Sequence, residues 1–201
     1  MMPIKFFRSN NKYFCFSNFS QHPVEVDGLK YPTSEHYYQS MKFYGVNPER
    51  AEQIRLAATP RIAADMGRDA SFEMQPDWEK YKIYYMCRVI QIKTDTYESI
   101  QKLLLETGEE EIIEDSPRDY YWGCGKDGSG KNKLGILWMT MRACLRDPYL
   151  MIPLPPDSIP PEARAKRKAI AASMDWDKIR EFIRTMRKEN LRDSLEAFNE
   201  E

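Results

Sequence analysis

The stretch Tyr31-Pro32-Thr33-Ser34-Glu35-His36-Tyr37-Tyr38-Gln39 decides how this 201-residue chain is interpreted. Thr33 or Ser34 can cap a helix that runs to Phe43 or Tyr44 and stops at Gly45. At about 100° per residue, one face of this helix carries polar groups and the opposite face is apolar. The polar face holds Glu35, Tyr38, Gln39 and Lys42, and the apolar face holds Tyr37, Met41 and Tyr44.

Two interpretations of the polar face remain open. An amphipathic surface helix with a solvated face is the common arrangement. Alternatively, the helix places the carboxylate of Glu35 and the ammonium group of Lys42 in one cleft. Such a pair can stabilise positive charge on a sugar carbon and transfer protons.

Short strands are predicted before this helix and further helices after it. Ile4–Phe7 and Tyr13–Phe16 flank a polar turn, and Val24–Val26 and Leu29–Tyr31 flank Asp27-Gly28, a hairpin signal. The predicted helix starts are Asn47-Pro48, Thr59-Pro60, Asp77, Asp95 with Glu98, and Asn132. The helix from Asp77 should reach about Lys93, and the last should end near Arg146, with a short strand at Glu111–Glu114. The sequence thus predicts a mainly α-helical α+β fold.

The end of the chain differs in composition. Residues 1–150 form the predicted main domain, the proline-dense segment MIPLPPDSIPP (151–161) is typical of a linker, and 162–201 form a charged helical extension. Ile179, Phe182, Ile183 and Met186 recur at i, i+3, i+4 and i+7, which makes one apolar stripe. This stripe either packs on the main domain of its own chain or forms a homo-oligomer or partner contact.

Composition excludes several classes of protein. The net charge of −1 argues against a generic, strongly basic nucleic-acid binder. No apolar run is long enough to span a membrane, and no signal peptide is recognisable, so we expect a cytoplasmic protein with no membrane partner. Four scattered cysteines and two histidines give no ligand set with metal-binding spacing. We therefore expect neither a metal nor a cofactor.

A second group of candidate residues lies in Glu114-Asp115-Ser116-Pro117-Arg118-Asp119-Tyr120-Tyr121-Trp122-Gly123-Cys124-Gly125. Gly123 and Gly125 would let the backbone approach a ligand, and Trp122 could stack on a base. The following helix begins near Asn132, where free N–H groups could hold a phosphate. The alternative is a tight turn around a core tryptophan.

Three other features carry weaker signals. The run GKDGSGK (125–131) matches GxxxxGK, but Asn132 stands where a P-loop needs Ser or Thr, and no buried strand precedes it, so we reject that motif. Arg68 could grip a phosphate, or it is an ordinary surface charge. Trp78, near a helix start, is either a core residue or a substrate contact.

These motifs, in this order, resemble the YbiA/NADAR family. The opening motifs are Phe16-Ser17-Asn18-Phe19 and Tyr31–Gln39 with Lys42-Phe43. Gly67-Arg68, Asp77-Trp78 with Met86 and Lys93, and Leu104-Leu105 with Thr107-Gly108 fit the middle. Glu114, Ser116-Pro117, Asp119, Trp122-Gly123, Gly125, Asn132, Leu134-Gly135 and Arg142 complete the pattern. The resemblance covers roughly two-thirds of the chain by motif order and omits the tail.

The resemblance implies a compact, mainly helical α+β domain that hydrolyses N-glycosidic bonds. Family substrates are ribosylamino-pyrimidine phosphates of riboflavin synthesis, or ADP-ribosylated guanine in nucleic acid, and the resemblance does not select between these partners. Glu35 and Asp119 are then the candidate carboxylates at an oxocarbenium-like carbon. Lys42 could protonate the leaving nitrogen, bind phosphate or attack the opened sugar as a Schiff-base amine.

The predicted substrate-binding set completes this hypothesis. Trp122 and Phe16 would stack on the base, while Asn18 could read its edge. The full set is Phe16, Asn18, Tyr38, Gln39, Arg68, Trp78, Trp122, Gly123, Gly125 and Asn132. The competing hypothesis is a non-catalytic module that binds an ADP-ribose-like nucleotide as a sensor.

Overall fold

A computed structural model describes residues 2–147 together with residues 160, 161 and 165. The chain divides into two compact units, Met1–Ser158 and Ile159–Glu201. The predicted linker at 151–161 and the extension at 162–201 thus lie almost wholly outside the described residues. Those boundaries, and the apolar stripe from Ile179 to Met186, stay predictions.

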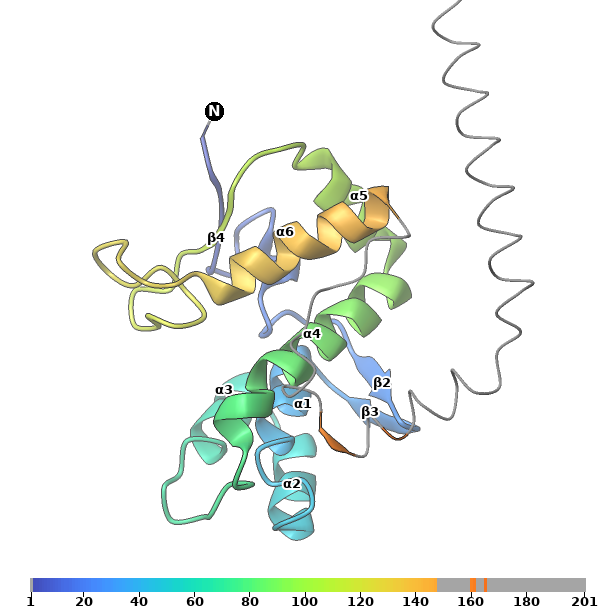
Figure 1. The fold of residues 1–201 in the computed structure, drawn as a ribbon, viewed down its shortest axis with the longest axis vertical. Helices are drawn as coiled ribbons and strands as arrows, with labels where there is room; N and C mark the ends of the chain where they lie inside the picture. Colours follow the sequence, from blue (N-terminus) through green and yellow to red (C-terminus); the bar gives the residue numbers. More distant parts are fainter. Residues whose placement is uncertain (1, 148–159, 162–164, 166–201) are drawn as a thin grey trace, which may run out of the picture. The chain divides into compact units, whose positions relative to one another are not determined.

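The first unit is mainly helical with a few short strands (Figure 1), as the sequence predicts. The N-terminal half contains β1 (Ile4–Phe6), the 3-10 helix η1 (Phe14–Phe16), β2 (Val24–Val26), β3 (Leu29–Tyr31), α1 (Ser34–Ser40), α2 (Pro48–Arg55) and α3 (Pro60–Met66). The remainder contains α4 (Trp78–Thr96), α5 (Glu98–Glu106), β4 (Ile112–Glu114) and α6 (Lys133–Arg146).

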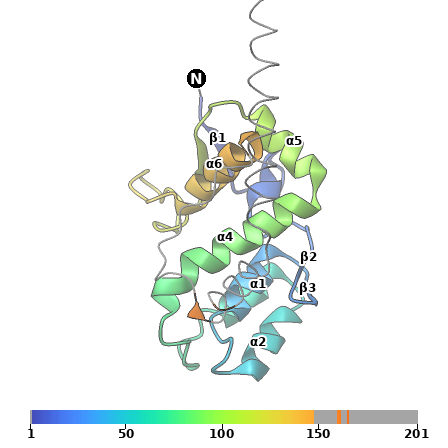
Figure 2. The same ribbon diagram turned by 45° about the vertical axis from the view of Figure 1, so that its right-hand side comes forward.

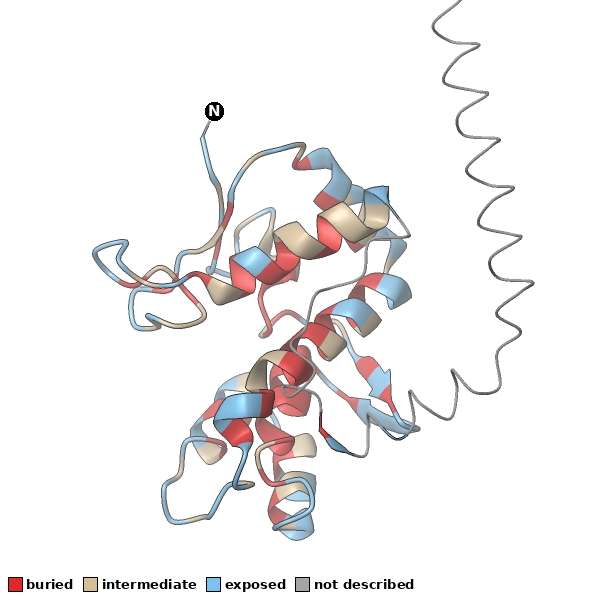
Figure 3. Ribbon diagram, viewed as in Figure 1, coloured by how far each residue is buried: buried red, intermediate tan, exposed pale blue. Residues whose placement is uncertain are grey.

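The long helix α4 joins two groups of elements. It contacts α1 and β2 on one side and α5 and α6 on the other. In Figures 1 and 2, α1 and α2 lie on one side of α4, while α5 and α6 lie on the other. Buried residues line α4 and the whole of α1 between these groups (Figure 3).

Both small sheets follow from local sequence. β2 and β3 pair antiparallel, and Asp27 and Gly28 between them have φ of 52° and 80°. Positive φ at both turn positions is what a two-residue hairpin of this kind requires, so the Asp27-Gly28 prediction is confirmed. β1 and β4 pair in parallel, with Phe6 opposite Glu114.

The end of α1 differs from the prediction. The helix stops at Ser40, and residues 41–46 form turns. The Gln75 N–H donates to the Lys42 carbonyl at 2.8 Å, and the Gln75 side chain donates to the Met41 carbonyl. Carbonyls at the helix end thus find partners from a distant loop, so the helix need not continue to Gly45.

The predicted strand at Tyr13–Phe16 is wrong. The segment is a 3-10 helix in which Phe14 and Phe16 donate to the carbonyls of Asn11 and Tyr13. Phe16 is fully buried against Trp138, whose indole N–H donates to the Phe16 carbonyl at 2.8 Å. Packing against α6 therefore overrides the local strand preference.

Caps explain most helix starts. Thr33, Asn47 and Thr59 accept N–H groups from the first turns of α1, α2 and α3, as predicted. The expected capping box at Asp95 and Glu98 is wrong, because α4 continues to Thr96 and α5 begins directly after Tyr97. Asp77 precedes α4 without a side-chain cap bond.

Candidate active site

Glu35 is a buried carboxylate on α1. All seven residues of α1 are buried, and Glu35 is only 6% exposed, so the solvated-face interpretation is wrong. Its backbone N–H donates to the Asn18 carbonyl at 3.0 Å, and Gln39 Nε2 donates to its Oε1 at 2.7 Å. Burial raises the pKa of Glu35, while the Gln39 hydrogen bond and the charges of Arg68 and Lys42 oppose that shift.

Lys42 lies in the turn that follows α1 and is partly buried. Its Nζ donates to the Gly67 carbonyl at 2.8 Å and lies 5.8 Å from the centre of the Trp78 ring. Burial lowers the pKa of Lys42 to about 8, although the negative charge of Glu35 opposes the shift. Lys42 therefore supplies an amine that titrates close to neutral pH and senses the Glu35 charge.

Gly67 holds this pair in place and was not among the predicted site residues. A Cβ at Gly67 would overlap the Gln39 side chain, which orients Glu35. The Gly67 carbonyl is also the acceptor for Lys42. The sequence signal was the motif Gly67-Arg68, in which only Arg68 was assigned a possible role. In the structure, the lack of a side chain at Gly67 leaves the space that the Gln39 side chain fills.

Aromatic rings from α1, α4 and the loop before α6 pack together next to Lys42. The Tyr38 ring lies 5.1 Å from Trp78 and 5.6 Å, edge-on, from Trp122. Trp78 stacks on Tyr85 with 13° between the planes and is buried, so its role as a core residue is clear. Trp122 is partly exposed and is therefore the ring available to a ligand.

Asp119 shapes the loop that presents Trp122. Its Oδ1 accepts the N–H groups of Tyr121 at 2.8 Å and Trp122 at 2.7 Å. The Asp119 carbonyl accepts the N–H of Gly125 at 3.1 Å. The carboxylate is thus committed to backbone donors, although its charge also contributes to the raised pKa values of Glu35 and Glu114.

The expected phosphate site at the start of α6 is wrong. The N–H groups of Asn132, Lys133 and Leu134 donate to the carbonyls of Gly123, Tyr121 and Trp122 at 3.0–3.1 Å. The Asn132 side chain is also occupied, since it bonds Glu114 N–H and the Ile112 carbonyl. These donors are therefore not free to hold an anion.

The two glycines of the loop are required by the loop itself. A Cβ at Gly123 would press on backbone oxygens of Glu114 and Asp119, and one at Gly125 would overlap the Tyr120 ring. Gly125 also has φ of 70°, which L side chains rarely adopt. The close backbone approach predicted from these glycines is thus made within the protein.

The other predicted contacts lie at different depths. Phe16 has no exposed surface, so the prediction that it stacks on a base is wrong. Asn18 is buried beside Glu35, with its Nδ2 donating to Met86 Sδ at 3.2 Å.

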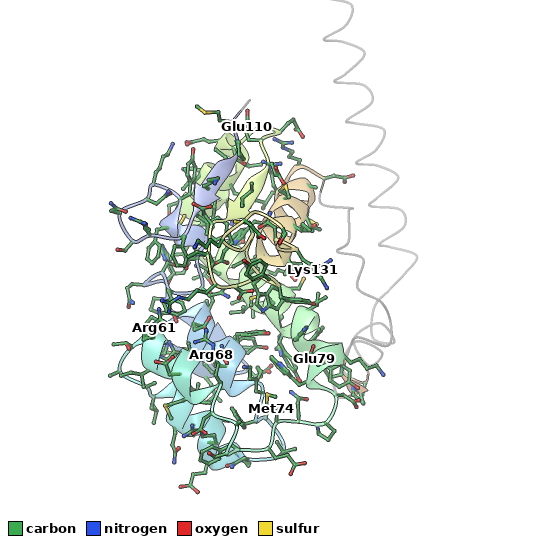
Figure 4. All side chains as sticks on the ribbon, turned by 90° about the vertical axis from the view of Figure 1, so that its left-hand side faces the viewer. Arg61, Arg68, Met74, Glu79, Glu110 and Lys131 are labelled. Carbon is green, nitrogen blue, oxygen red and sulfur yellow. The ribbon has the colours of Figure 1, made fainter. Side chains whose placement is uncertain are left out.

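Arg68 is exposed and pairs with Asp65 at 3.4 Å, yet its charge acts on both Glu35 and Lys42. Figure 4 shows Arg68 and Lys131 on the same face.

Glu114 is a further carboxyl that the predicted set omitted. Burial is the main cause that raises its pKa to about 8, and the charges of Asp119 and Glu35 add to it. The available signal was an acidic residue at the inward-facing position of a short strand.

Among the residues that the structure describes, no group of three or more His, Cys, Asp and Glu could hold a metal ion.

Comparison with known proteins places this site in a family. The family model of the NADAR domain matches residues 5–146. The chain belongs to the NADAR family. The resemblance predicted from the motifs is thereby confirmed, and the matched region contains every element of the candidate site.

Several NADAR relatives carry functional names. N-glycosidase YbiA of Escherichia coli (strain K12) is 40% identical over 139 residues, which cover 69% of this chain and 86% of that protein. An N-glycosidase of Nostoc punctiforme is 38% identical over 147 residues, 73% of this chain and 94% of that protein. The chloroplastic riboflavin biosynthesis protein PYRR of Zea mays is 39% identical over 153 residues, 70% of this chain and 25% of that protein.

A solved structure supports the same NADAR assignment. The NMR structure of Escherichia coli YbiA superposes with a TM-score of 0.67 at 37% sequence identity. The match covers 76% of this chain and 92% of that one, which confirms the predicted α+β fold. Within the described residues, no helix has the length and apolar character needed to cross a membrane.

Proposed function

We propose that this NADAR protein is an N-glycosidase that hydrolyses the C–N bond of a ribosylamino-pyrimidine phosphate. The observation that carries the proposal is the buried Glu35 carboxylate beside Lys42, bounded by the Tyr38, Trp78 and Trp122 rings. The names of the Escherichia coli, Nostoc and maize relatives support the same reaction and pathway.

The chemistry of the bond explains why this arrangement suits it. Breaking a glycosyl C–N bond builds positive charge on the sugar carbon C1, as in other glycoside hydrolyses. Glu35 is held by the Gln39 side chain and by its own helix, so its carboxylate can be oriented before the charge develops. The low exposure of Glu35 strengthens its attraction for that charge, because little water screens it.

The surroundings of Glu35 and Lys42 fit a phosphorylated nucleotide-like substrate. Trp122 offers a partly exposed ring on which a pyrimidine can stack. The cation Arg68, whose charge acts on both Glu35 and Lys42, can bind the phosphate of the sugar. A cytoplasmic location belongs to the same proposal, because a phosphorylated intermediate does not cross a lipid bilayer unaided.

Mass spectrometry of two reactions tests the proposal. The purified chain is incubated separately with the ribosylamino-pyrimidine phosphate and with an oligonucleotide that carries ADP-ribosylated guanine. We expect release of ribose phosphate and the free aminopyrimidine in the first reaction. Cleavage of the oligonucleotide alone would assign the chain to the ADP-ribosyl branch of the family. Tight binding of ADP-ribose with no turnover in either reaction would support the sensor hypothesis and contradict the enzyme.

A further inference from the structure

Glu114 is the last residue of β4, and its side chain points into the protein. Side chains alternate between the faces of a strand, so Glu114 shares a face with Ile112. In the β1–β4 ladder it lies opposite Phe6. Ile112 and Phe6 have no exposed surface, which marks this face as the core side. Glu114 itself keeps partial exposure.

The backbone around Glu114 is fixed from two directions. Its N–H donates to Asn132 Oδ1 at 3.0 Å, and its carbonyl accepts the N–H of Cys124 at 2.9 Å. Gly123 lies directly against that carbonyl, where even a Cβ would be too close. The start of α6 and the Trp122 loop therefore both hold the backbone of Glu114.

Negative charges add to the effect of burial on Glu114. Those charges are the carboxylates of Asp119 on the loop and Glu35 on α1. The nearest lysine on the paired strand, Lys5, forms its ion pair with Asp115 at 3.0 Å. No ion pair links Glu114 to a lysine or arginine within the described ranges. This environment favours the protonated form of Glu114, in agreement with a pKa of about 8.

Burial raises the pKa of both Glu35 and Glu114, but the groups around the two carboxyls differ. Glu35 accepts an N–H from Gln39 and feels the cations Arg68 and Lys42, all of which favour its charged form. Glu114 is instead acted on by burial and by the carboxylates of Asp119 and Glu35, which favour its neutral form. When two neighbouring acids are driven apart in this way, one is suited to stabilise a cation and the other to donate a proton.

We propose that Glu114 is the general acid that protonates the leaving nitrogen. The inference rests on the proposed N-glycosidase function and adds a residue to it. The C1–N bond breaks with its electron pair remaining on nitrogen, and the carboxyl proton of Glu114 completes the new N–H bond. Water then bonds to C1 and returns one proton to the Glu114 carboxylate. The net change is the addition of one water across the C–N bond, with Glu35 balancing the positive charge at C1.

Two substrates with different leaving groups separate this role from a structural one. The amine of a ribosylamino-pyrimidine phosphate must gain a proton to leave. The pyridinium nitrogen of nicotinamide mononucleotide leaves as a neutral base and needs none. We would measure kcat for the wild type, Glu114→Gln and Glu114→Asp on both substrates. Glu111→Gln, an exposed carboxylate next to β4, serves as the matched control.

The expected result is selective. Glu114→Gln should lower kcat about 10²–10⁴-fold on the ribosylamino substrate, the usual range for a lost general acid. Its kcat on nicotinamide mononucleotide should fall by less than about fivefold, since no proton is needed there. Glu111→Gln should match the wild type, and Glu114→Asp should keep part of the activity because it retains an acid. Circular dichroism should show Glu114→Gln to be folded, as the amide mimics the protonated carboxyl.

Other outcomes would overturn the inference. Equal losses on both substrates would make Glu114 a structural residue, and full activity of Glu114→Gln would remove it from the reaction. If the wild type leaves the pyridinium substrate intact, N-aryl ribosylamine phosphates replace it. The Glu114→Gln effect must then grow as the leaving amine becomes more basic, and a constant effect would contradict the role. A wild type that cleaves none of these compounds would instead count against the proposed function itself.

Discussion

At the scale of single residues, burial favours the neutral forms of both Glu35 and Lys42, while their mutual attraction favours the charged forms. We expect Glu35→Gln to lower kcat about 10²–10⁴-fold, because the amide cannot balance a cationic C1. The amide oxygen can still accept the Gln39 N–H, so the fold should persist in a thermal melt. Glu25→Gln, an exposed carboxylate on β2, is the control. Full turnover in a folded Glu35→Gln variant would remove Glu35 from the mechanism.

The amine of Lys42 leads to a second prediction. With a pKa of about 8, roughly a tenth of the molecules carry a neutral Lys42 at pH 7, and most carry one above pH 9. We predict that Lys42 condenses, with loss of water, with the open-chain aldehyde of the released ribose phosphate. Borohydride should reduce this imine to an adduct, detected as a mass increase in the peptide that contains Lys42. The yield should rise between pH 7 and pH 9, since only the neutral amine attacks.

Two variants check the site of the adduct. Lys42→Arg should form none, while Lys82→Arg, which changes a partly buried lysine over the Tyr121 ring, should form as much as the wild type. Turnover without any trapped adduct at pH 9 would assign Lys42 to proton transfer or phosphate binding instead.

At the scale of elements, the loop between β4 and α6 is held in shape by Asp119. We predict that Asp119→Asn keeps most of the activity, because the amide oxygen can still accept the N–H groups of Tyr121 and Trp122. Asp119→Ala removes that acceptor, so it should raise KM at least tenfold by releasing Trp122, a loss of about 1.4 kcal/mol. Steady-state kinetics with a tryptophan fluorescence spectrum would measure both effects. A large loss of kcat in Asp119→Asn would return Asp119 to direct chemistry.

The helix starts could be predicted from the sequence, but several other features of the elements could not. Thr33, Asn47 and Thr59 act within three residues of themselves, so local rules identified those helix starts. The end of α1 depends on Gln75, the shape of η1 on Trp138, and the role of Asn132 on β4, all distant in the chain. The polar face with Glu35 and Lys42 followed from helical periodicity. The role of Gly67 could not be predicted from the sequence, because it depends on where the Gln39 side chain lies in the fold.

At the scale of the whole molecule, the candidate site is assembled by α4, which joins α1 to the elements that follow it in the chain. Glu35 and Glu114 belong to α1 and β4, and no spacing rule relates two positions that far apart in the chain.

The tail beyond residue 150 contributes none of these groups. A chain ending at residue 150 should therefore retain kcat, while its melting temperature or oligomeric state changes if the stripe from Ile179 to Met186 is buried in the full chain. Light scattering, thermal melting and the glycosidase assay would test this. A folded but inactive shortened chain would show that the tail completes the site.

Stability of the whole domain should depend on a second buried lysine. Lys93 on α4 donates to the Ser17 carbonyl at 3.0 Å and to Ser20 Oγ at 2.6 Å, in the segment whose Asn18 carbonyl accepts the Glu35 N–H. Burial lowers the pKa of Lys93 from 10.5 to about 7, against the opposing charge of Cys15. Between these values the unfolded chain binds a proton that the folded chain does not, so the Lys93 contribution to stability rises with pH.

Lys93→Met is the comparison that isolates this effect. The free energy of unfolding of the wild type, minus that of Lys93→Met, should increase from pH 7 towards pH 10.5 by up to about 1.4 kcal/mol per pH unit and be flat below pH 7. Denaturant unfolding at a series of pH values gives both curves, and the subtraction removes every other titrating group. Because Lys93 fixes the segment beside Glu35, Lys93→Met should also raise KM more than it lowers kcat. Parallel stability curves from pH 7 to pH 10 would mean that Lys93 stays charged in the folded protein, held by Ser17 and Ser20 alone.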